Sequence, residues 1–241
     1  MHTSNPILRV RIVLSIRYQS MKTVTVFDEH SDRYDNWFNR NPILASNELE
    51  TVKELLPEKK DPCIEIGVGT GWFSSKIKCS HGVDPSIGML RKARQRGIEV
   101  IQGYAEQLPL KSRDFQTVLM IVTLCFVDDP YRALEESARI VRSDGSLIIC
   151  IVPRDSQWGK YYIELGMNGH PFYSVAKFYT QQEVESYMNI HGFYMDSCLG
   201  VLRFPPQSKA VREEPEKCSG KEGFICMRFK QWTPRVSRSY R

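Results

Sequence analysis

Residues 64–73 read IEIGVGTGWF. An apolar run that contains one carboxylate, Glu65, leads directly into three glycines at alternate positions, Gly67, Gly69 and Gly71. Because glycine has no side chain and tolerates positive φ, such a segment lets a ligand approach the backbone closely. We therefore expect a buried strand followed by a ligand-binding turn. A dinucleotide-binding turn would look similar, so the turn alone does not identify the ligand.

The chain around this turn alternates between apolar runs and helical patterns. Helices of this length between strands indicate a parallel sheet with helices on both faces, so we expect a doubly wound α/β fold. Strands are expected at residues 63–68, 81–84, 98–103, 117–127 and 146–152, with helices at 43–56, 71–78, 86–97 and 129–141. A helix at 179–192 and two strand-like segments at 193–204 and 223–229 follow, the latter two joined by a loop at 205–222. Asp129 and Thr180 are expected helix caps, and Glu183 is placed to complete a capping box.

Length and composition suit one α/β domain. The chain has 241 residues, of which 41% are apolar and 25% charged, as is usual for a soluble globular protein. The apolar stretch at 7–16 is interrupted by Arg9 and Arg11. It lacks both the ~20 uncharged residues of a membrane span and the pattern of a signal peptide. We therefore expect a cytoplasmic protein without a membrane span.

The net charge of +5 comes from the two ends of the chain. Residues 1–20 carry three arginines and no acid, and residues 227–241 carry five basic residues and no acid. Without these eight, the body has 25 basic against 28 acidic residues, a net charge of −3. A groove for a nucleic-acid backbone is therefore not indicated.

The seven cysteines are odd in number and include no C-x-x-C pair. Several lie in apolar runs, where cysteine behaves as a small hydrophobic residue. We expect reduced thiols, with neither a disulfide framework nor a zinc site. The five histidines do not cluster with cysteines or acids at ligand spacing, so no metal is expected.

The glycine turn departs from the dinucleotide fingerprint G-x-G-x-x-G. Its third glycine comes one residue early, and Trp72 stands where that fingerprint has its last glycine, so its bulk would obstruct a pyrophosphate. An acid, then x-G-x-G-x-G, resembles instead the first motif of class I S-adenosylmethionine (SAM)-dependent methyltransferases. The small-molecule type, which includes the menaquinone and sterol methylators, is the most similar. Four further segments resemble that family's motifs in order: GVDPSIGML, QGYAEQLPL, TLCFVDDP and VRSDGSLIICIV.

The resemblance implies a Rossmann-like methyltransferase fold of seven mostly parallel strands, in which the last two segments form an antiparallel edge. It is strong over residues 27–152 and weaker to residue 230. We expect residues 1–20 to be a disordered leader or the product of a start assigned too early. Residues 21–230 are expected to form a single domain, with 27–152 as donor-binding core and 153–230 as acceptor side and edge strands. Residues 231–241 would be a basic tail.

The resemblance also implies a donor site. Asp84 ends the second strand, where the family's acid accepts hydrogen bonds from both ribose hydroxyls. Glu65 is expected near the donor's amino group and Met89 against the adenine. The donor-binding residues implied are Glu65, Gly67, Gly69, Gly71, Asp84, Met89, Tyr104, Ala105, Glu106 and Thr123.

Two motifs depart from the family's pattern. Tyr104 replaces the usual acid beside the adenine, so Tyr104 could stack on the base while the Ala105 backbone and the Glu106 side chain meet its edge. After the fourth strand, Leu124 and Cys125 stand where polar residues are common, which makes this wall more apolar.

No catalytic dyad stands out. A sulfonium methyl group is already activated, so the reaction needs alignment and exclusion of water, no metal, and a base only if the acceptor carries a proton. Tyr34 resembles the aromatic residue that covers the donor in related enzymes, and Asp155 and His170 follow the fifth strand, where acceptor-side groups often lie. Each of the three has an alternative role as an ordinary packing or surface residue.

These patterns favour a SAM-dependent methyltransferase that transfers a methyl group to a small molecule by in-line displacement. Three alternatives stay open: the acceptor is an RNA or a protein docked by the basic tails, the protein is an NAD(P)-dependent oxidoreductase, or it binds the donor without catalysis. The segment TLCF after the fourth strand lacks the D/N-P-P-Y turn of enzymes that methylate DNA adenine or glutamine amides.

Overall fold

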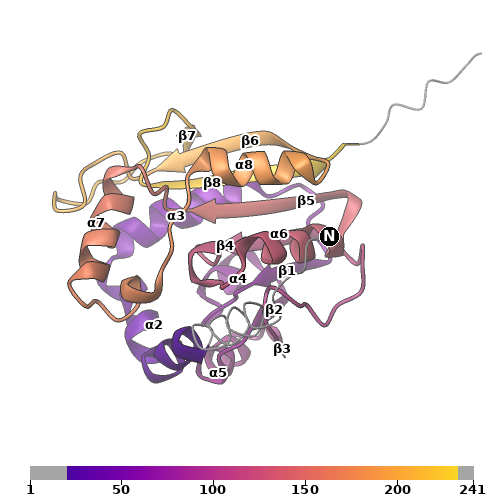
Figure 1. The fold of residues 1–241 in the computed structure, drawn as a ribbon, viewed down its shortest axis with the longest axis horizontal. Coiled ribbons are helices and arrows are strands. Elements are labelled where there is room, and N and C mark those ends of the chain that lie inside the picture. Colours follow the sequence, from indigo (N-terminus) through magenta and orange to yellow (C-terminus); the bar gives the residue numbers. More distant parts are fainter. Residues whose placement is uncertain (1–20, 233–241) are drawn as a thin grey trace, which may run out of the picture.

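The computed structural model describes residues 21–232, so the expected leader and residues 233–241 of the expected tail lie outside the described residues. A single eight-stranded sheet runs through the molecule in the order β3-β2-β1-β4-β5-β8-β6-β7 (Figure 1). The strands are β1 (Cys63–Ile66), β2 (His81–Asp84), β3 (Glu99–Gln102), β4 (Phe115–Ile121), β5 (Val141–Ile151), β6 (Phe193–Val201), β7 (Glu216–Lys217) and β8 (Phe224–Gln231). The first five are parallel, while β8, β6 and β7 pair antiparallel to their neighbours. The expected doubly wound fold is confirmed.

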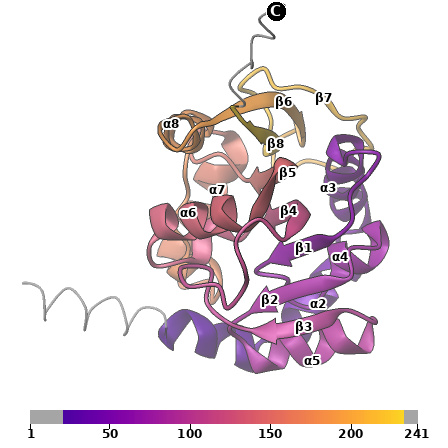
Figure 2. The same cartoon turned by 90° about the vertical axis from the view of Figure 1, so that its right-hand side faces the viewer.

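Helices cover both faces of this sheet (Figure 2). They are α2 (Ser31–Arg40), α3 (Pro42–Leu55), α4 (Trp72–Ile77), α5 (Ile87–Gln95), α6 (Pro130–Ile140), α7 (Gln157–Met167) and α8 (Gln181–Ile190). Residues 21–29 are also helical, and two 3-10 turns, η1 (Leu124–Phe126) and η2 (Tyr173–Val175), complete the set. Figure 1 shows α7 beyond the carboxyl end of β5, which is the end where a parallel sheet places its ligands.

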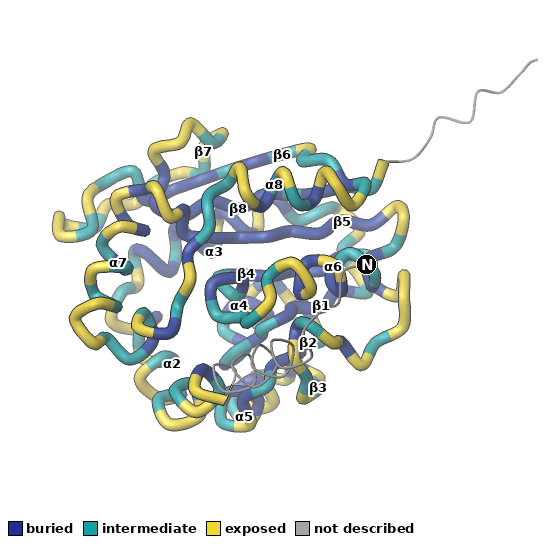
Figure 3. Tube along the Cα trace, viewed as in Figure 1, coloured by how far each residue is buried: buried dark blue, intermediate teal, exposed yellow. Residues whose placement is uncertain are grey.

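The core is divided by the sheet into two apolar layers. Along β4, Leu119 packs on the layer that holds α3 and α4, whereas Val118 and Met120 pack on the layer that holds α6 and α8. This alternation follows the two-residue period of a strand. Figure 3 shows β4, β5 and β8 almost continuously buried. Complete burial of each such side chain contributes about 1.5–3 kcal/mol, which fixes the register of the strands that carry the site.

Helix starts agree with the capping residues in the sequence. The Asp129 carboxylate accepts a 3.0 Å hydrogen bond from the backbone N–H of Arg132. Thr180 and Glu183 form the expected reciprocal capping box at α8. Ser86 caps α5 by accepting from the N–H of Met89. Each cap satisfies backbone donors that the first turn of a helix leaves free.

The main differences from the expectation concern two strands and the number of strands in the sheet. The apolar run at 117–127 is not one strand, because β4 ends at Ile121 and the chain turns at Val122 before η1. The fifth strand begins at Val141 rather than at 146. The sheet has eight strands rather than seven, because Glu216 and Lys217, within the expected loop, pair with Gly200 and Leu199 of β6.

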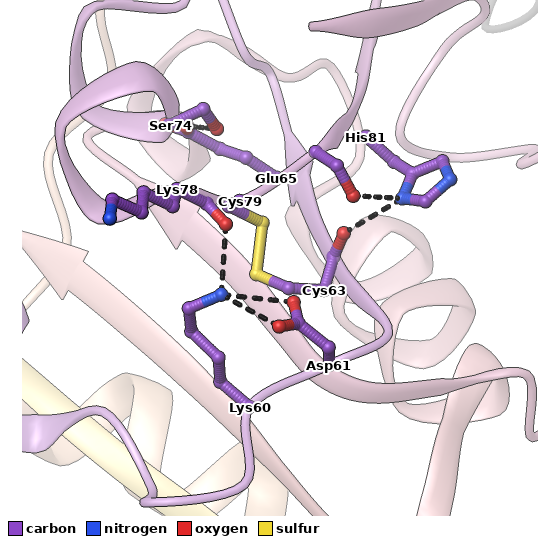
Figure 4. The surroundings of a disulfide bond; sticks show 9 residues. Lys60, Asp61, Cys63, Glu65, Ser74, Lys78, Cys79 and His81 are labelled. Carbon is purple, nitrogen blue, oxygen red and sulfur yellow. Dashed lines mark hydrogen bonds and ion pairs between the residues drawn. A yellow bond between two sulfur atoms is a disulfide. The ribbon is translucent and has the colours of Figure 1, made fainter.

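The expectation of reduced cysteines is wrong in this structure. Cys63 is joined to Cys79, Cys150 to Cys226, and Cys198 to Cys218, which leaves Cys125 as a free, buried thiol. Six of the seven cysteines are buried and Cys218 is half-buried, and the fold also brings pairs of them together. Cys150 and Cys226, for example, are register partners on β5 and β8. Figure 4 shows the Cys63–Cys79 bond joining the start of β1 to the turn after α4, beside a 2.8 Å contact from Lys60 to the Lys78 carbonyl.

Residues 21–232 contain neither a membrane-spanning helix nor a cluster of metal-binding side chains. No helix there is long and apolar enough to cross a bilayer. No group of three or more histidine, cysteine or acidic side chains is arranged to hold a metal ion.

Candidate active site

The site lies where the strand order reverses, between β1 and β4. Gly67 follows β1 and Thr123 follows β4, and these two strands are parallel neighbours. A crevice at the carboxyl ends of the strands on either side of such a reversal is the usual ligand site of open α/β sheets. A cavity of about 90 Å³ occupies this position, and Gly67, Gly69 and Thr123 all line it. We call it the first cavity.

The glycine turn is built so that only a bare backbone fits. Gly67 has φ +71°, and a Cβ added there would lie 2.2 Å from Cγ2 of Thr123. Gly69 has φ +52° and lies open toward Tyr34, the nearest atom to an added Cβ being 3.7 Å away. Positive φ and close approach both favour glycine, as the sequence indicates. The turn therefore presents main chain, not side chains, to the first cavity.

Asp84 ends β2 and lines the same cavity. Its two carboxylate oxygens accept hydrogen bonds of 2.9 Å from the backbone N–H groups of Gly69 and Ser86. Burial raises the pKa of Asp84 to about 6, although these two bonds act in the opposite direction. The carboxylate is thus fixed in orientation and is ionised at neutral pH, with lone pairs left to accept further hydroxyl donors.

The next wall of the first cavity comes from α5 and from the segment after β3. Met89 is buried there, and Tyr104, Ala105 and Glu106 continue the lining. The Glu106 carboxylate accepts a 2.8 Å hydrogen bond from the N–H of Asp128, so its side chain also braces the segment after η1. Tyr104 is 45% exposed, which leaves its ring free to contact a ligand.

Helical residues 21–29 cover the first cavity with Thr23, Val24 and Phe27. Asp28 anchors this cover, because one of its carboxylate oxygens accepts from the hydroxyl of Ser86 at 2.5 Å and from the N–H of Gly88 at 2.8 Å.

Two further acids after residue 30 hold the chain on α5. Asp32 pairs with Lys92, and Asp35 pairs with Arg96 at 3.0 Å. Together with Asp28 they place the N-terminal part of the described chain over the site.

A second, larger cavity of about 480 Å³ adjoins the first. Tyr34, Val122 and Phe126 line both and form the wall between them. Val122 has φ +50°, which is unusual for a β-branched residue and holds the chain in a sharp turn at this wall. The second cavity is lined mainly by aromatic side chains from α2, α7 and the segment around η2.

Most of the residues expected at the donor site come together. Eight of the ten line the first cavity: Gly67, Gly69, Asp84, Met89, Tyr104, Ala105, Glu106 and Thr123. Glu65 and Gly71 do not. The Glu65 carboxylate lies beneath the turn and accepts the hydroxyl of Ser74, and Gly71 packs against Ala93 of α5.

The three acceptor-side candidates lie in three different positions relative to the cavities. Tyr34 lies between the two cavities, and burial, with the neighbouring Glu65 and Glu48 carboxylates, raises the pKa of its phenol far above the ordinary range. His170 lines the second cavity, and burial and the nearby Arg33 lower its pKa. Asp155 is exposed and lines neither cavity.

Sequence reasoning missed several residues of the site. The cover at 21–29 carries no motif, although the mixture of aromatics and acids from Phe27 onward indicates a helix lying over another element. Val122 falls inside an apolar run that reads as strand, and nothing in the sequence marks its turn. Glu48 of α3 lines the second cavity, but in the sequence it has the pattern of an exposed helix acid, so no local signal marks it as a site residue.

Known proteins are similar to this chain in sequence and in architecture. Residues 64–149 match the family described as methyltransferase domain. An uncharacterized protein of Methanocaldococcus jannaschii is 34% identical over 204 residues, which are 85% of this chain and 98% of that one. A demethylmenaquinone methyltransferase of a Mycobacterium species is 28% identical over 161 residues, 62% of this chain and 69% of that one.

A solved structure agrees more closely. A SAM-dependent methyltransferase of Thermotoga maritima, described as a possible histamine N-methyltransferase, superposes with a TM-score of 0.82 at 37% identity. The match covers 87% of this chain and 100% of that one. Together with the glycine turn, Asp84 and the strand order, these likenesses show that the chain belongs to the class I SAM-dependent methyltransferases.

Proposed function

We propose that the first cavity binds SAM and that the second holds a small-molecule acceptor, to which the methyl group is transferred by in-line displacement. The observation that carries this proposal is the shared wall of Tyr34, Val122 and Phe126. A donor in one cavity and an acceptor in the other would meet at this wall, where two reactants can be held in line.

The residues of the first cavity fit the donor by their chemistry. The bare backbone at Gly69, where an added Cβ would meet no atom nearer than 3.7 Å, leaves room that a larger side chain would fill. Asp84 offers an ionised carboxylate to two adjacent hydroxyls. We propose that Met89, Tyr104, Ala105 and Glu106 contact the adenine.

The donor, when bound, supplies an activated methyl group. The chain's own contribution is alignment and exclusion of water, and effective concentration alone can lower such a barrier by about 7–11 kcal/mol. The aromatic lining of the second cavity and the helical cover at 21–29 both serve to exclude water.

A small molecule is favoured over a macromolecular acceptor by the shape and charge of the site. The second cavity lies within the size range of small-ligand sites, about 300–1,000 Å³. Of the basic residues near the carboxyl end, Arg228 and Lys230 both pair with Asp196, at 2.8 and 3.0 Å, and so are engaged within the fold.

We keep the cytoplasmic location and the single domain at 21–230 as proposals. Disulfides are rare in most cytosolic proteins, but intracellular proteins of hyperthermophiles carry them often. Trapping of thiols in living cells, followed by fractionation, tests the location.

Calorimetric titration with S-adenosylhomocysteine tests the donor, beside NAD and with Asp84→Ala as control. We expect micromolar binding of S-adenosylhomocysteine alone, with loss of that binding in the variant. Binding of NAD instead would contradict the proposed donor and support the oxidoreductase alternative.

A further inference from the structure

The second cavity contains one carboxylate among its lining residues, that of Glu48 on α3. Glu48 is only 6% exposed, and no residue among 21–232 donates a hydrogen bond to its side chain or forms an ion pair with it. The cationic side chains Arg33 and Arg40 that line the same cavity are themselves exposed. A largely buried carboxylate that has no partner on the chain is costly, so its position favours a ligand that brings a hydrogen-bond donor or a cation to it.

Aromatic rings surround this carboxylate. Glu48 is close enough to Tyr34, Tyr162 and Tyr173 that its charge raises the pKa of all three phenols. Tyr162 and Tyr173 are stacked, with ring centroids 4.3 Å apart. Aromatic faces attract a cation within about 6 Å of the centroid, and most strongly where water is excluded. The arrangement is that of a pocket for a positively charged group on an apolar body.

We propose that the second cavity binds an acceptor whose amino group is held by the Glu48 carboxylate, with the apolar or aromatic remainder of the molecule against the surrounding rings. This names the substrate class of the acceptor site and rests on the proposed function. Glu48 is then both the binding partner of the ammonium and the acceptor of its proton.

The proton and electron balance is simple. An N–H bond of the ammonium breaks, its proton forms an O–H bond on Glu48, and the electron pair stays on nitrogen. That pair forms the new N–C bond to the methyl group while the C–S bond breaks, its electrons remaining on sulfur. The products are a methylated ammonium and a neutral thioether. Burial raises the pKa of Glu48 to about 8, so the ionised carboxylate is a stronger base than an ordinary one and is available to take a proton from an amine at pH 8 and above.

Other groups that face the cavity do not compete for this role. The phenols of Tyr34, Tyr162 and Tyr173, from α2, α7 and η2, have raised pKa values and stay protonated. Burial raises the pKa of the Cys125 thiol, beside η1, to about 12. Burial and the nearby Arg33 lower the pKa of His170, which disfavours its charged form. Arg33 and Arg40, the cationic side chains of the lining, are exposed.

The test compares amines with matched alcohols on protein saturated with S-adenosylhomocysteine. The pairs are 2-phenylethylamine with 2-phenylethanol, and tyramine with 4-(2-hydroxyethyl)phenol, each measured by calorimetry. We expect at least one amine to bind tenfold or more tightly than its alcohol at pH 8, and this preference to weaken toward pH 6 as Glu48 takes up a proton.

Glu48→Gln keeps the shape and removes the charge. We expect it to lower amine affinity at least tenfold and to abolish the pH dependence, with alcohol affinity unchanged. Glu50→Gln, on the exposed side of the same helix, is the matched control and should behave as the wild type. Binding of S-adenosylhomocysteine should be the same in all three proteins, which also shows that they are folded.

Two outcomes overturn the inference. If neither amine is preferred over its alcohol, or if Glu48→Gln leaves amine binding unchanged, while S-adenosylhomocysteine still binds, the acceptor is not an amine held by Glu48 and the proposed function stands. If the wild type does not bind S-adenosylhomocysteine, the proposed function fails and this inference fails with it.

Discussion

The backbone N–H of Gly69 donates a 2.9 Å hydrogen bond to the carboxylate of Asp84. This bond joins the turn after β1 to the end of β2, so the two elements that define the first cavity are fixed relative to each other. Because the bond needs an ionised acceptor to be strong, the geometry of the turn and the charge of Asp84 are coupled.

Donor binding should therefore depend on the charge of Asp84. Burial raises the pKa of this group to about 6, so we expect affinity for S-adenosylhomocysteine to fall as the pH drops from 7 to 5. Asp84→Asn removes the charge from the acceptor, and a hydrogen bond to a charged group is worth about 1.5–3 kcal/mol, so we expect a loss of roughly 10–100-fold for each bond that is lost. Calorimetry across this pH range checks both points. A variant that retains the wild-type pH profile would contradict the assignment.

Gly67→Ala should be among the most damaging substitutions in the turn. The new Cβ would lie 2.2 Å from Thr123, and φ is +71°. Overpacking and left-handed strain together cost about 2–5 kcal/mol of the free energy of unfolding. Urea denaturation measures this loss, and the added substitution Thr123→Ala should recover at least about 1 kcal/mol of it.

Gly69→Ala is the control for this pair, because its Cβ would have a normal 3.7 Å contact. It should carry only the backbone strain of about 1–2 kcal/mol. Equal costs for the two glycines would show that Thr123 does not restrict the turn.

The contacts of Asp28 with Ser86 and Gly88 hold the helical cover at 21–29 closed, so weakening them should let the cover open. The first cavity, at about 90 Å³, is smaller than ligand sites usually are, so we expect helical residues 21–29 to shift when the donor binds. Asp28→Ala should speed hydrogen exchange in residues 21–29 and raise the dissociation rate of S-adenosylhomocysteine several-fold. Glu29→Ala, an exposed neighbour, should change neither. Unchanged exchange in Asp28→Ala would mean that other contacts hold the cover.

The three disulfides predict one free thiol per chain among the seven cysteines. Alkylation under denaturing, non-reducing conditions should label Cys125 alone, as mass spectrometry can show. Reduction should lower the midpoint of thermal unfolding, since a disulfide that closes a loop of the chain contributes about 2–4 kcal/mol to the free energy of unfolding. Seven labelled thiols in freshly purified protein would restore the expectation of reduced cysteines.

Local signals in the sequence were sufficient for the parallel core. Apolar runs separated by helical patterns placed the strands, and the residues Asp129 and Thr180 placed helix starts, because each of these signals acts within a few residues. The donor-binding residues are implied by the family resemblance, and the strand order brings together the strand ends that carry two of them, Gly67 and Asp84.

The remaining features depend on contacts between distant segments. Pairing of Cys150 with Cys226 follows from strand register over 76 residues, and no local pattern encodes it. Glu48 reads as an ordinary helix acid, and only the packing of α2, α7 and η2 around α3 buries it. The acceptor side is therefore the part of the site that the sequence alone leaves open.

Val122 offers the last prediction, because a β-branched residue at φ +50° stores backbone strain. Its N–H donates to the Cys150 carbonyl at 2.9 Å, which holds the turn against β5. Val122→Gly relieves a left-handed cost of about 1–2 kcal/mol, whereas Val127→Gly, at φ −85° and also half-buried, relieves none. We expect Val122→Gly to be the less destabilising of the two by about that amount in urea denaturation. Equal costs would mean that the surrounding contacts, and not the backbone, determine the stability of this wall between the cavities.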